Sequence, residues 1–538
     1  MKIALIQAPV WWTVDPPLGL AQVAGCAGAA GHQVLVCDLN MALWKDRPKA
    51  YDSLWLWEQF HHWNDPAFVK QLFGEQSATV ERELARVLLS GARLIGLSVN
   101  AGAQWATLEA ARRLKAQDPG LKIVLGGQYF FFGDKAREML ADPAIDAVVA
   151  GAGDEAFPAL LKSFEAKGTI EPAPGVWVKR GGEIVSGGEP LPMRELDGLP
   201  FADFSGFPLS LYSDPVRLPI AASRGCVWQC RFCSARAFWP GYASMSGERV
   251  FAEVMHQKKL FPERCHFEFH DITANGDVKA LQRFARLMGD AMQADAKNFI
   301  GWKINAIIRP EMTPEVLAEL KRANCHDIIY GIESGSPRVL ELMNKPYSLE
   351  VAERVLKDTH EAGIITTVNI MFGFPGETEE DFARTLDFLR RNRPSLDRVY
   401  GSATFTSLEA RSYLAEHQGQ FAVKQVPPER EHSLYWESED GSNTYPVRMD
   451  RYYRFRKLCL ELGLEAYKGI NGGLEQDRLS NLSQYYRHRG YPLTALRHYL
   501  DYLELDLYHE PTRCHLSAQR SALAAVCSAQ RALERAAG

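Results

Sequence analysis

The first 166 residues alternate short apolar runs with segments of helical periodicity. Runs such as "KIALIQAP" and "QVLVCDLN" have the length of buried strands, whereas "LGLAQVAGCAGAAG" and "WATLEAARRLKAQ" repeat apolar residues at helical spacing. This order is typical of a parallel sheet with helices on both faces. We therefore predict a doubly wound α/β domain over residues 1–166.

The loops after these predicted strands are candidate ligand sites, because ligands of doubly wound sheets bind beyond the carboxyl ends of the strands. They read "APVWW", "SVNAG", "GGQYF" and "GAGDEA". The last of them matches the dinucleotide fingerprint G-x-G-x-x-A, but it follows the fifth predicted strand instead of the first, which disfavours a dinucleotide. The residues predicted to bind a cofactor here are Trp11, Trp12, Ser98, Asn100, Gly126, Gly127, Gln128, Gly151 and Gly153.

Three further regions follow. Residues 167–215 are predicted to be a connector that contains a small hairpin, "GVWVKRGGEIV", and a stretch rich in proline and glycine. Residues 216–395 alternate strands such as "HFEFHD" and "DIIYGIES" with helices such as "PEVLAELKRAN", which indicates a partial or complete parallel (β/α) barrel. Residues 396–538 have helical periodicity and are predicted to form a mainly helical domain, to which no catalytic residue is assigned.

Composition narrows the class of protein. Hydrophobic residues make up 46% of the chain and charged residues 24%, as in soluble globular proteins, and no apolar stretch reaches the roughly 18 residues of a membrane helix. The formal net charge of -5 leaves no basic surplus to neutralise phosphates. Ten cysteines in 538 residues are too few for a disulfide scaffold. We expect a cytoplasmic protein that binds neither nucleic acid nor membrane.

Three cysteines are clustered in "SRGCVWQCRFCSAR", directly after the first predicted barrel strand. Cys226, Cys230 and Cys233 have the spacing C-x3-C-x2-C, and three thiolates suit zinc or an iron-sulfur cluster. A structural zinc ion would need a fourth ligand, for which Cys265 and Cys325 are isolated candidates. A [4Fe-4S] cluster held by three cysteines would instead keep one iron open to bind a small molecule.

The cysteine motif resembles that of the radical S-adenosylmethionine (SAM) enzymes, with an aromatic residue, Phe232, before the last cysteine. "GIESGSPRVLELMNK" and "FGFPGETEEDF" strengthen the resemblance. The preceding domain is similar to the cobalamin-binding domain of one subgroup, through "PPLGLAQVAGCAGAAGHQVLVCDLN", "GGQYFFF", "GAGDEAF" and "ELDGLPFADF". The resemblance covers residues 1–395 and implies three cofactors: a [4Fe-4S] cluster, SAM and cobalamin.

The resemblance also implies residue roles. The three clustered cysteines would hold the cluster, whose open iron chelates SAM; an electron from the cluster would cleave SAM to a 5'-deoxyadenosyl radical. Phe232 would lie against the adenine, and Glu333 and Ser334 would face the ribose or methionine part. Asp271 and Lys303, at other strand ends, are further candidates. Structural alternatives stay open: Phe232 in a core, Glu333 in a salt bridge, and a turn shaped by Gly373, Pro375 and Gly376.

Two features depart from the subgroup's pattern. The chain has no D-x-H-x-x-G motif, and His32, in the first predicted sheet, lies in a helix-to-strand turn. If cobalamin binds, a histidine of that motif does not hold the lower face of cobalt. Tyr129 also stands where relatives often carry a histidine.

The resulting functional hypothesis is a cobalamin-dependent radical SAM methyltransferase that acts on an unactivated carbon or phosphorus. The alternative is cyclisation, rearrangement or oxidation with the same cofactors. Methylthiolation is disfavoured because the N-terminal domain has only Cys26 and Cys37, and a non-catalytic sensor would not need a SAM-ready barrel. The expected partners are a small-molecule or peptide substrate and an external electron donor such as flavodoxin or ferredoxin.

Overall fold

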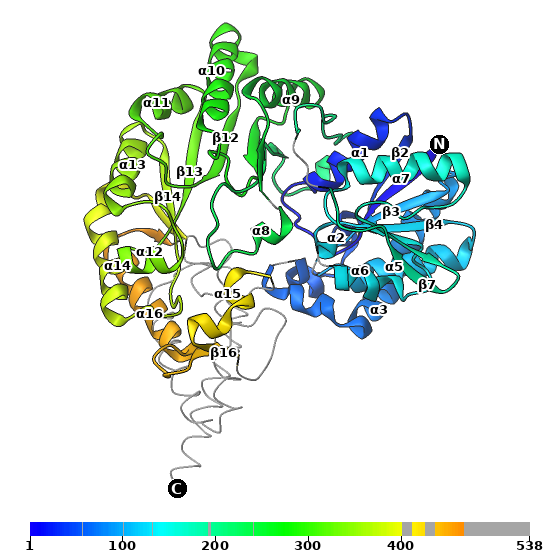
Figure 1. Ribbon diagram of the computed structural model, residues 1–538. Coiled ribbons are helices and arrows are strands. Elements are labelled where there is room, and N and C mark those ends of the chain that lie inside the picture. Colours follow the sequence, from blue (N-terminus) through cyan, green and yellow to red (C-terminus); the bar gives the residue numbers. More distant parts are fainter. Residues whose placement is uncertain are drawn as a thin grey trace.

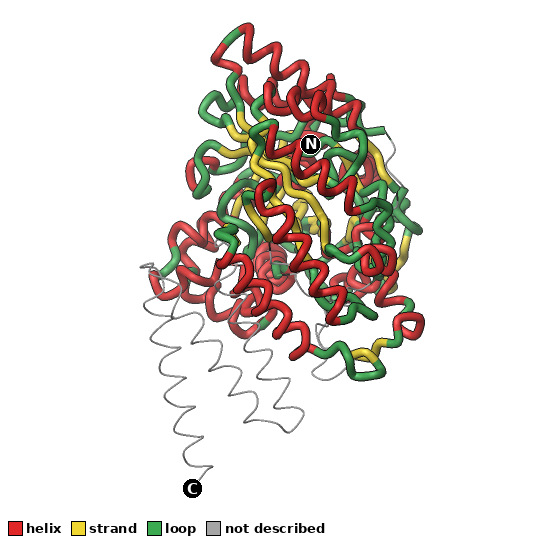
Figure 2. Tube along the Cα trace, turned by 90° about the vertical axis from the view of Figure 1, so that its left-hand side faces the viewer, coloured by secondary structure: helices red, strands yellow, loops and turns green. Residues whose placement is uncertain are grey.

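Two seven-stranded sheets organise the chain. The computed structural model describes residues 1–466, except 56, 101, 132, 192–194, 240, 401–410 and 426–435. The N-terminal sheet lies beside the central sheet, and helices surround the strands of both (Figures 1 and 2). Residues 467–538, which make up the second half of the predicted helical domain, lie outside the described residues.

The N-terminal sheet has the strand order β2-β1-β3-β4-β5-β6-β7. Its first five strands are parallel, which confirms the doubly wound prediction. The hairpin β6–β7 pairs antiparallel with β5, so this part of the predicted connector extends the sheet. The strands are β1 (Lys2–Gln7), β2 (Gln33–Asp38), β3 (Leu94–Ser98), β4 (Lys122–Gly126), β5 (Ala147–Val149), β6 (Val176–Arg180) and β7 (Glu183–Ser186).

Two hydrophobic cores lie on opposite faces of this sheet, because alternate residues of each strand point to opposite sides. Ile3 and Leu5 of β1 pack with α1 and α7, whereas Ala4 and Ile6 pack with the helices inserted before β5. The helical elements are α1 (Leu18–Ala29), α2 (Leu39–Asp46), η1 (Lys49–Trp55), η2 (Trp57–Asn64), α3 (Pro66–Glu75), α4 (Ser77–Leu89), α5 (Gln104–Gln117), η3 (Gln128–Phe130), α6 (Gly133–Leu140) and α7 (Gly153–Lys167).

The central sheet is parallel throughout, in the order β18-β15-β14-β13-β12-β11-β8. β8 and β18 are its two edges, so the described residues form an open, partial barrel. Its last two strands follow residue 395, where the predicted barrel ends. The strands are β8 (Arg217–Ile220), β11 (His266–Phe269), β12 (Gly301–Ala306), β13 (Cys325–Glu333), β14 (Ile365–Ile370), β15 (Arg398–Tyr400) and β18 (Glu465–Ala466).

Helices connect and surround the strands of the central sheet, and two short hairpins accompany it. The helices are α8 (Ala235–Phe238), α9 (Gly247–Leu260), α10 (Val278–Ala294), α11 (Pro314–Arg322), α12 (Pro337–Leu342), α13 (Leu349–Glu361), α14 (Glu379–Asn392), α15 (Tyr413–Glu416) and α16 (Tyr445–Glu461). The hairpins pair β9 (Ser223–Gly225) with β10 (Tyr242–Ser244) and β16 (Val423–Gln425) with β17 (Trp436–Ser438). Within the described part of the chain, no helix has the length and apolarity needed to cross a membrane.

Candidate functional site

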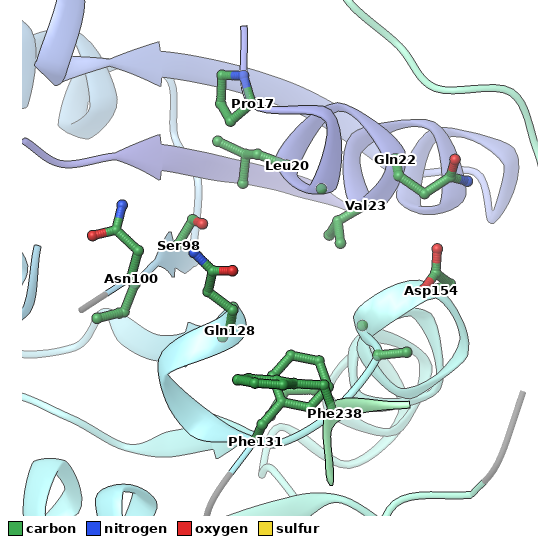
Figure 3. A pocket seen from close by; sticks show the side chains of 18 of the residues that line it. Pro17, Leu20, Gln22, Val23, Ser98, Asn100, Gln128, Phe131, Asp154 and Phe238 are labelled. Carbon is green, nitrogen blue, oxygen red and sulfur yellow. The ribbon is translucent and has the colours of Figure 1, made fainter. Parts of the chain in front are cut away.

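A cavity of about 540 Å³ lies where the carboxyl edge of the N-terminal sheet meets the loop that carries the three cysteines. We call it the cofactor cavity. Leu20 and Val23 of α1 lie opposite Phe131 and Phe238 across it (Figure 3). Its volume is in the range of known cofactor sites, about 300 to 1,000 Å³. Every residue predicted as a cofactor contact of the N-terminal domain lines this cavity except Trp12, which is partly buried elsewhere.

Glycines shape the cavity wall at two strand ends. Gly127, after β4, has a φ of 106°, and a Cβ atom there would lie 2.6 Å from the carbonyl oxygen of Val99. Gly151, after β5, has a φ of 80°, and its Cβ would lie 2.7 Å from Pro190. Both positions therefore require glycine, because a side chain would be strained and would clash.

Polar groups of the neighbouring loops fix the rim of the cavity. Asn100 donates from Nδ2 to the carbonyl of Val10 over 3.0 Å and accepts from the amide of Gly102 over 2.9 Å. The amide of Trp11 donates to Asn40 Oδ1 over 3.1 Å. The indole Nε1 of Trp11 is buried and has no hydrogen-bond partner in the described part of the chain. A bound molecule with an acceptor at this position would satisfy it.

The cysteine loop, residues 226–233, follows β8 and β9 and reaches the cofactor cavity through Cys233. Backbone amides point at two of its sulfurs: Trp228 N lies 3.4 Å from Cys226 Sγ, and Ala235 N lies 3.4 Å from Cys233 Sγ. Burial raises the pKa of the Cys226 and Cys230 thiols, while the Lys345 ammonium lowers both. Backbone amides in and next to the loop therefore supply hydrogen-bond donors to the thiols, and Lys345 supplies positive charge.

The geometry of the thiols argues against a zinc site. Among the described residues, only Asp15, Glu268 and His270 form a trio of metal-binding side chains with all ligand atoms within 4.8 Å of one another, so the three cysteine sulfurs are spread more widely. A tetrahedral zinc ion would hold its sulfurs about 3.8 Å apart. Cys325 is fully buried at the amino end of β13 and Cys265 precedes β11, so both lie across the sheet from the cysteine loop. At about 3.3 Å per residue, β13 alone separates its two ends by about 26 Å.

Residues 220–389, which contain the cysteine loop and most of the central sheet, match the model of the radical SAM superfamily. This part of the chain is a domain of the radical SAM superfamily. The prediction made from the cysteine motif is thus confirmed. The same residues form the open parallel barrel described above, which we call the radical SAM domain.

Several curated proteins resemble the chain over part of its length. An uncharacterised methyltransferase of Pyrococcus horikoshii is 27% identical over 55% of this chain and 64% of its own length. The anaerobic magnesium-protoporphyrin IX monomethyl ester cyclase of Cereibacter sphaeroides is 25% identical over 50% of this chain and 44% of its own. The bacteriochlorophyllide d C-12(1)-methyltransferase of Chlorobaculum tepidum is 27% identical over 33% of this chain and 38% of its own length. The chain thus spans less than two thirds of each of these relatives.

Solved structures share the fold over most of the chain. The radical SAM methyltransferase TsrM from Kitasatospora setae superposes with a TM-score of 0.62, covering 86% of this chain and 89% of TsrM at 15% identity. OxsB, described as a cobalamin-dependent SAM radical enzyme, superposes with a TM-score of 0.58 over 92% of this chain and 68% of OxsB at 14% identity. At such identities the similarity establishes the fold: a Rossmann-like parallel sheet followed by a radical SAM barrel.

Glu333 and Ser334 end β13 of the radical SAM domain but face different surroundings. Glu333 has a φ of 69°, and its Oε1 lies 3.2 Å from the buried Lys345 Nζ, so it forms a salt bridge beside the cysteine loop. The Ser334 hydroxyl is fully buried, lies 3.2 Å from Thr385 Oγ1 and accepts from the amide of Ser336. Glu333 is thus placed near the cysteines, whereas Ser334 contacts α14.

Phe232 and the predicted turn after β14 lie against each other. Phe232 packs on a buried cluster that includes Met343, Met371 and Phe374. The amide of Glu377 donates to the carbonyl of Phe374 over 2.8 Å, and Gly376 has a φ of 84°, as a type II turn with proline in second position requires. The turn prediction is confirmed. Phe232 packs against this cluster, and its place against the adenine of SAM stays a prediction.

Lys303 does not lie at a strand end, contrary to expectation. It is the third residue of β12, and its Nζ lies 2.8 Å from Glu268 Oε1 inside the barrel. Glu268 also pairs with Arg217 at 2.5 Å. Lys303 is therefore neutralised by an acidic partner within the sheet, and the strand continues to Ala306 beyond it.

Two residues outside the predicted set connect the radical SAM domain to the N-terminal sheet across the cofactor cavity. Arg224, in β9, donates to both carboxylate oxygens of the buried Asp154 at the start of α7, over 3.0 and 3.3 Å. The Arg224 guanidinium lies 4.9 Å from the ring centroid of Trp239, which packs against Phe131. Arg224 and Asp154 are 70 positions apart in the sequence, and no local sequence pattern relates them.

His32 and Tyr129, which the comparison with cobalamin-binding domains singled out, do not line the cofactor cavity. His32 is buried at the amino edge of the N-terminal sheet, 3.3 Å from the N-terminal amine of Met1. Tyr129 packs edge-on against Phe130 at 5.5 Å. A different histidine, His270 after β11, lines the cavity from the barrel side.

Asp271 is buried where β11 ends and accepts from the amide of Ala222 over 3.0 Å and from the Ser223 hydroxyl. It thereby fixes the chain that leads into the cysteine loop, although it does not line the cavity. Burial raises the pKa of its carboxyl to about 6, and the hydrogen bonds from Ser223 and Ala222 oppose that shift.

This raised pKa predicts a pH dependence of stability. Asp271 contributes to the free energy of unfolding. This contribution is fully present below the unfolded pKa of about 3.9 and is lost as the pH rises through about 6, because the carboxyl of the unfolded chain loses its proton at a lower pH than that of the folded chain. The expected loss is about 3 kcal/mol, an upper bound for two pKa units. Urea unfolding of the metal-free chain between these pH values should show the decline in wild type and a smaller one in Asp271→Asn. Equal slopes in the two proteins would contradict the assignment.

Proposed function

We propose that the protein is a cobalamin-dependent radical SAM enzyme that methylates an unactivated carbon or phosphorus centre. The observation that carries the proposal is the lining of the cofactor cavity, in which strand ends of the N-terminal sheet and Cys233 of the cysteine loop face one space. A methyl donor held by the sheet and a radical generated beside the cluster would meet there. Methyltransferases among the relatives support the choice of reaction.

The cavity suits cobalamin by shape and by chemistry. Between α1 and the strands it is lined by Leu5, Leu20, Val124 and Phe157, and the absence of a side chain at Gly96 lets Leu5 and Phe157 pack directly against the sheet. At the rim, Ser98 and Gln128 offer hydroxyl and amide groups to the amide side chains of a corrin ring, and the indole N–H of Trp11 needs an acceptor. These residues, with Gly126, Gly127, Gly151 and Gly153, would hold the cofactor.

The cysteine loop suits a [4Fe-4S] cluster with one open iron. Cys226, Cys230 and Cys233 would be its ligands, and Lys345 would offset the negative charge that three thiolates bring together. Glu333, paired with Lys345 at the end of β13, would orient the polar part of SAM. When bound, the cluster supplies an electron, SAM is the source of a 5'-deoxyadenosyl radical, and cobalamin supplies a transferable methyl group. The electron would come from a one-electron donor such as flavodoxin or ferredoxin.

A second outcome with the same cofactors is cyclisation, rearrangement or oxidation of the substrate. The similarity to an anaerobic cyclase over half of the chain favours keeping this candidate. The two functions differ in the fate of the SAM methyl group. Methylation consumes it, whereas the alternative leaves it on the sulfur of methionine.

The test is anaerobic reconstitution with iron, sulfide and hydroxocobalamin, followed by a strong reductant and methyl-labelled SAM. The proposed function predicts retention of cobalamin, cleavage of SAM to 5'-deoxyadenosine, and S-adenosylhomocysteine as the product of methyl transfer. 5'-Deoxyadenosine without S-adenosylhomocysteine would favour the alternative. A chain that forms the cluster but retains no cobalamin would overturn the assignment of the N-terminal domain.

A further inference from the structure

The segment between β15 and β18 contacts the cysteine loop directly. The backbone amide of Leu414, in α15, donates to the carbonyl of Arg231 over 2.9 Å, and Arg231 lies between two of the clustered cysteines. The Leu414 side chain is fully buried in the cluster against which Phe232 packs. The guanidinium of Arg231 lies 6.0 Å from the ring centroids of Tyr413 and Phe421. Residues 412–425 thus support the cysteine loop from the side of the C-terminal segment.

The same segment also holds the turn after β14. Asn443 donates from Nδ2 to the carbonyls of Gly373 and Phe374, over 3.1 and 3.3 Å. The fully buried Arg448 donates to Asn443 Oδ1 over 3.1 Å and to the carbonyl of Trp436 over 3.0 Å. A Cβ atom on Gly373, whose φ is 72°, would lie 2.2 Å from Arg448 Cδ, so the turn and Arg448 fit only with glycine there.

A buried ion pair completes these contacts. Arg451 Nη1 of α16 lies 2.8 Å from Glu377 Oε2, and the two side chains are 2% and 0% exposed. Glu377 Oε2 also accepts a hydrogen bond from the amide of Gly373 at the start of the turn. Burying a charge pair costs desolvation free energy, but the pair then favours one arrangement of the groups that it joins. Here it fixes α16 against the turn.

The turn and the cysteine loop meet at Phe232, which precedes Cys233 and packs with Phe374, Met371 and Leu414. We propose that residues 412–425 and 436–451 are a positioning element of the cluster and SAM site, which clamps the cysteine loop against the turn after β14. The inference rests on the proposed function for the identity of the bound groups, but the clamp itself acts on the protein alone. The C-terminal segment is therefore part of the radical SAM site and more than a cover for substrate.

Arg451→Met tests the clamp, and Arg454→Ala is its matched control. Arg454 lies one turn further along α16 and pairs with Glu379 at 2.7 Å, but both side chains are about half exposed, at 44% and 56%. We expect Arg451→Met to weaken SAM binding to the reconstituted enzyme at least about tenfold, as loss of an outer partner of a metal site does. Arg454→Ala should bind SAM like wild type, and both variants should retain cobalamin like wild type.

A second readout keeps this inference separate from the proposed function. In the full-length metal-free chain, iodoacetamide should alkylate Cys226, Cys230 and Cys233 severalfold faster in Arg451→Met than in Arg454→Ala, because the loop has lost its support. The double variant Glu377→Gln/Arg451→Met removes both charges, so no buried charge stays unpaired, and it should give the same result where the single variant does not fold. Unchanged alkylation in the folded double variant would overturn the clamp. A wild-type chain that takes up no cluster would overturn the proposed function instead.

Discussion

Replacing Cys226, Cys230 or Cys233 by alanine is expected to abolish cluster binding and, with it, SAM cleavage. The three thiols follow β9 on one short loop, and amides of Trp228 and Ala235 together with Lys345 stabilise their charged form. Because each would be a direct ligand, its loss should exceed the roughly 10- to 100-fold cost of losing an outer partner of a metal site. Iron and sulfide content after anaerobic reconstitution, with 5'-deoxyadenosine formation, measures the effect.

Two other cysteines of the barrel serve as controls. Cys265→Ala and Cys325→Ala should leave the iron content unchanged, because both residues lie at the amino ends of their strands, across the sheet from the cysteine loop. Stoichiometric zinc without iron in wild type, or iron loss in Cys265→Ala, would contradict the cluster assignment. Burial strongly raises the pKa of the Cys325 thiol, which also disfavours it as a metal ligand.

The strands that carry the sites could be predicted from the sequence because each is a short apolar run ended by glycine, proline or a polar residue. β1, β3 and β4 are buried along nearly their whole length, as strands covered by helices on both faces must be. The cysteine loop was equally predictable, since its three cysteines fall within eight residues. In both cases the information is local in the chain.

The parts that escaped prediction depend on contacts between distant residues. β15 and β18 have only three and two residues, which is too short for a hydrophobic periodicity to predict them. The direction of the Ser334 hydroxyl is decided by Thr385 on α14, and the pairing of Arg224 with Asp154 by the packing of two domains. A pattern along the chain identifies residues that end a strand, but it does not say which of them turns toward the cavity.

The C-terminal clamp illustrates the same limit. "GFPGE" predicts a turn from its glycines and proline. Nothing in that motif indicates that Asn443 and Arg451, about 70 residues further on, bind its carbonyls and its glutamate. Burial raises the pKa of Glu377 to about 7, and the nearby Arg451 opposes that shift. The turn is therefore a joint product of two segments, and its partner became visible only in three dimensions.

Gly19→Phe is expected to abolish cobalamin retention while the cluster still assembles. Gly19 lies in the first turn of α1 and lines the cofactor cavity, and no heavy atom of the described residues lies within 4 Å of a Cβ atom placed there. A phenyl group would therefore occupy cavity space without displacing the core. Replacing a helical glycine also removes a cost of about 0.5–1 kcal/mol, so the domain should remain folded. We expect at least a tenfold loss of affinity for hydroxocobalamin, about 1.4 kcal/mol or more.

Gly28 offers a matched control on the same helix. It is exposed, has open space around its Cβ position, and does not line the cavity. Gly28→Phe adds the same side chain to α1 and should retain cobalamin like wild type, and both variants should hold the same iron as wild type. The two cofactors are read separately, by cobalamin absorbance after gel filtration and by iron analysis. Equal cobalamin retention by Gly19→Phe and Gly28→Phe would show that cobalamin does not enter this cavity. Loss of cobalamin in Gly19→Phe alone, with the iron content intact, would place cobalamin between α1 and the strand ends of the N-terminal sheet.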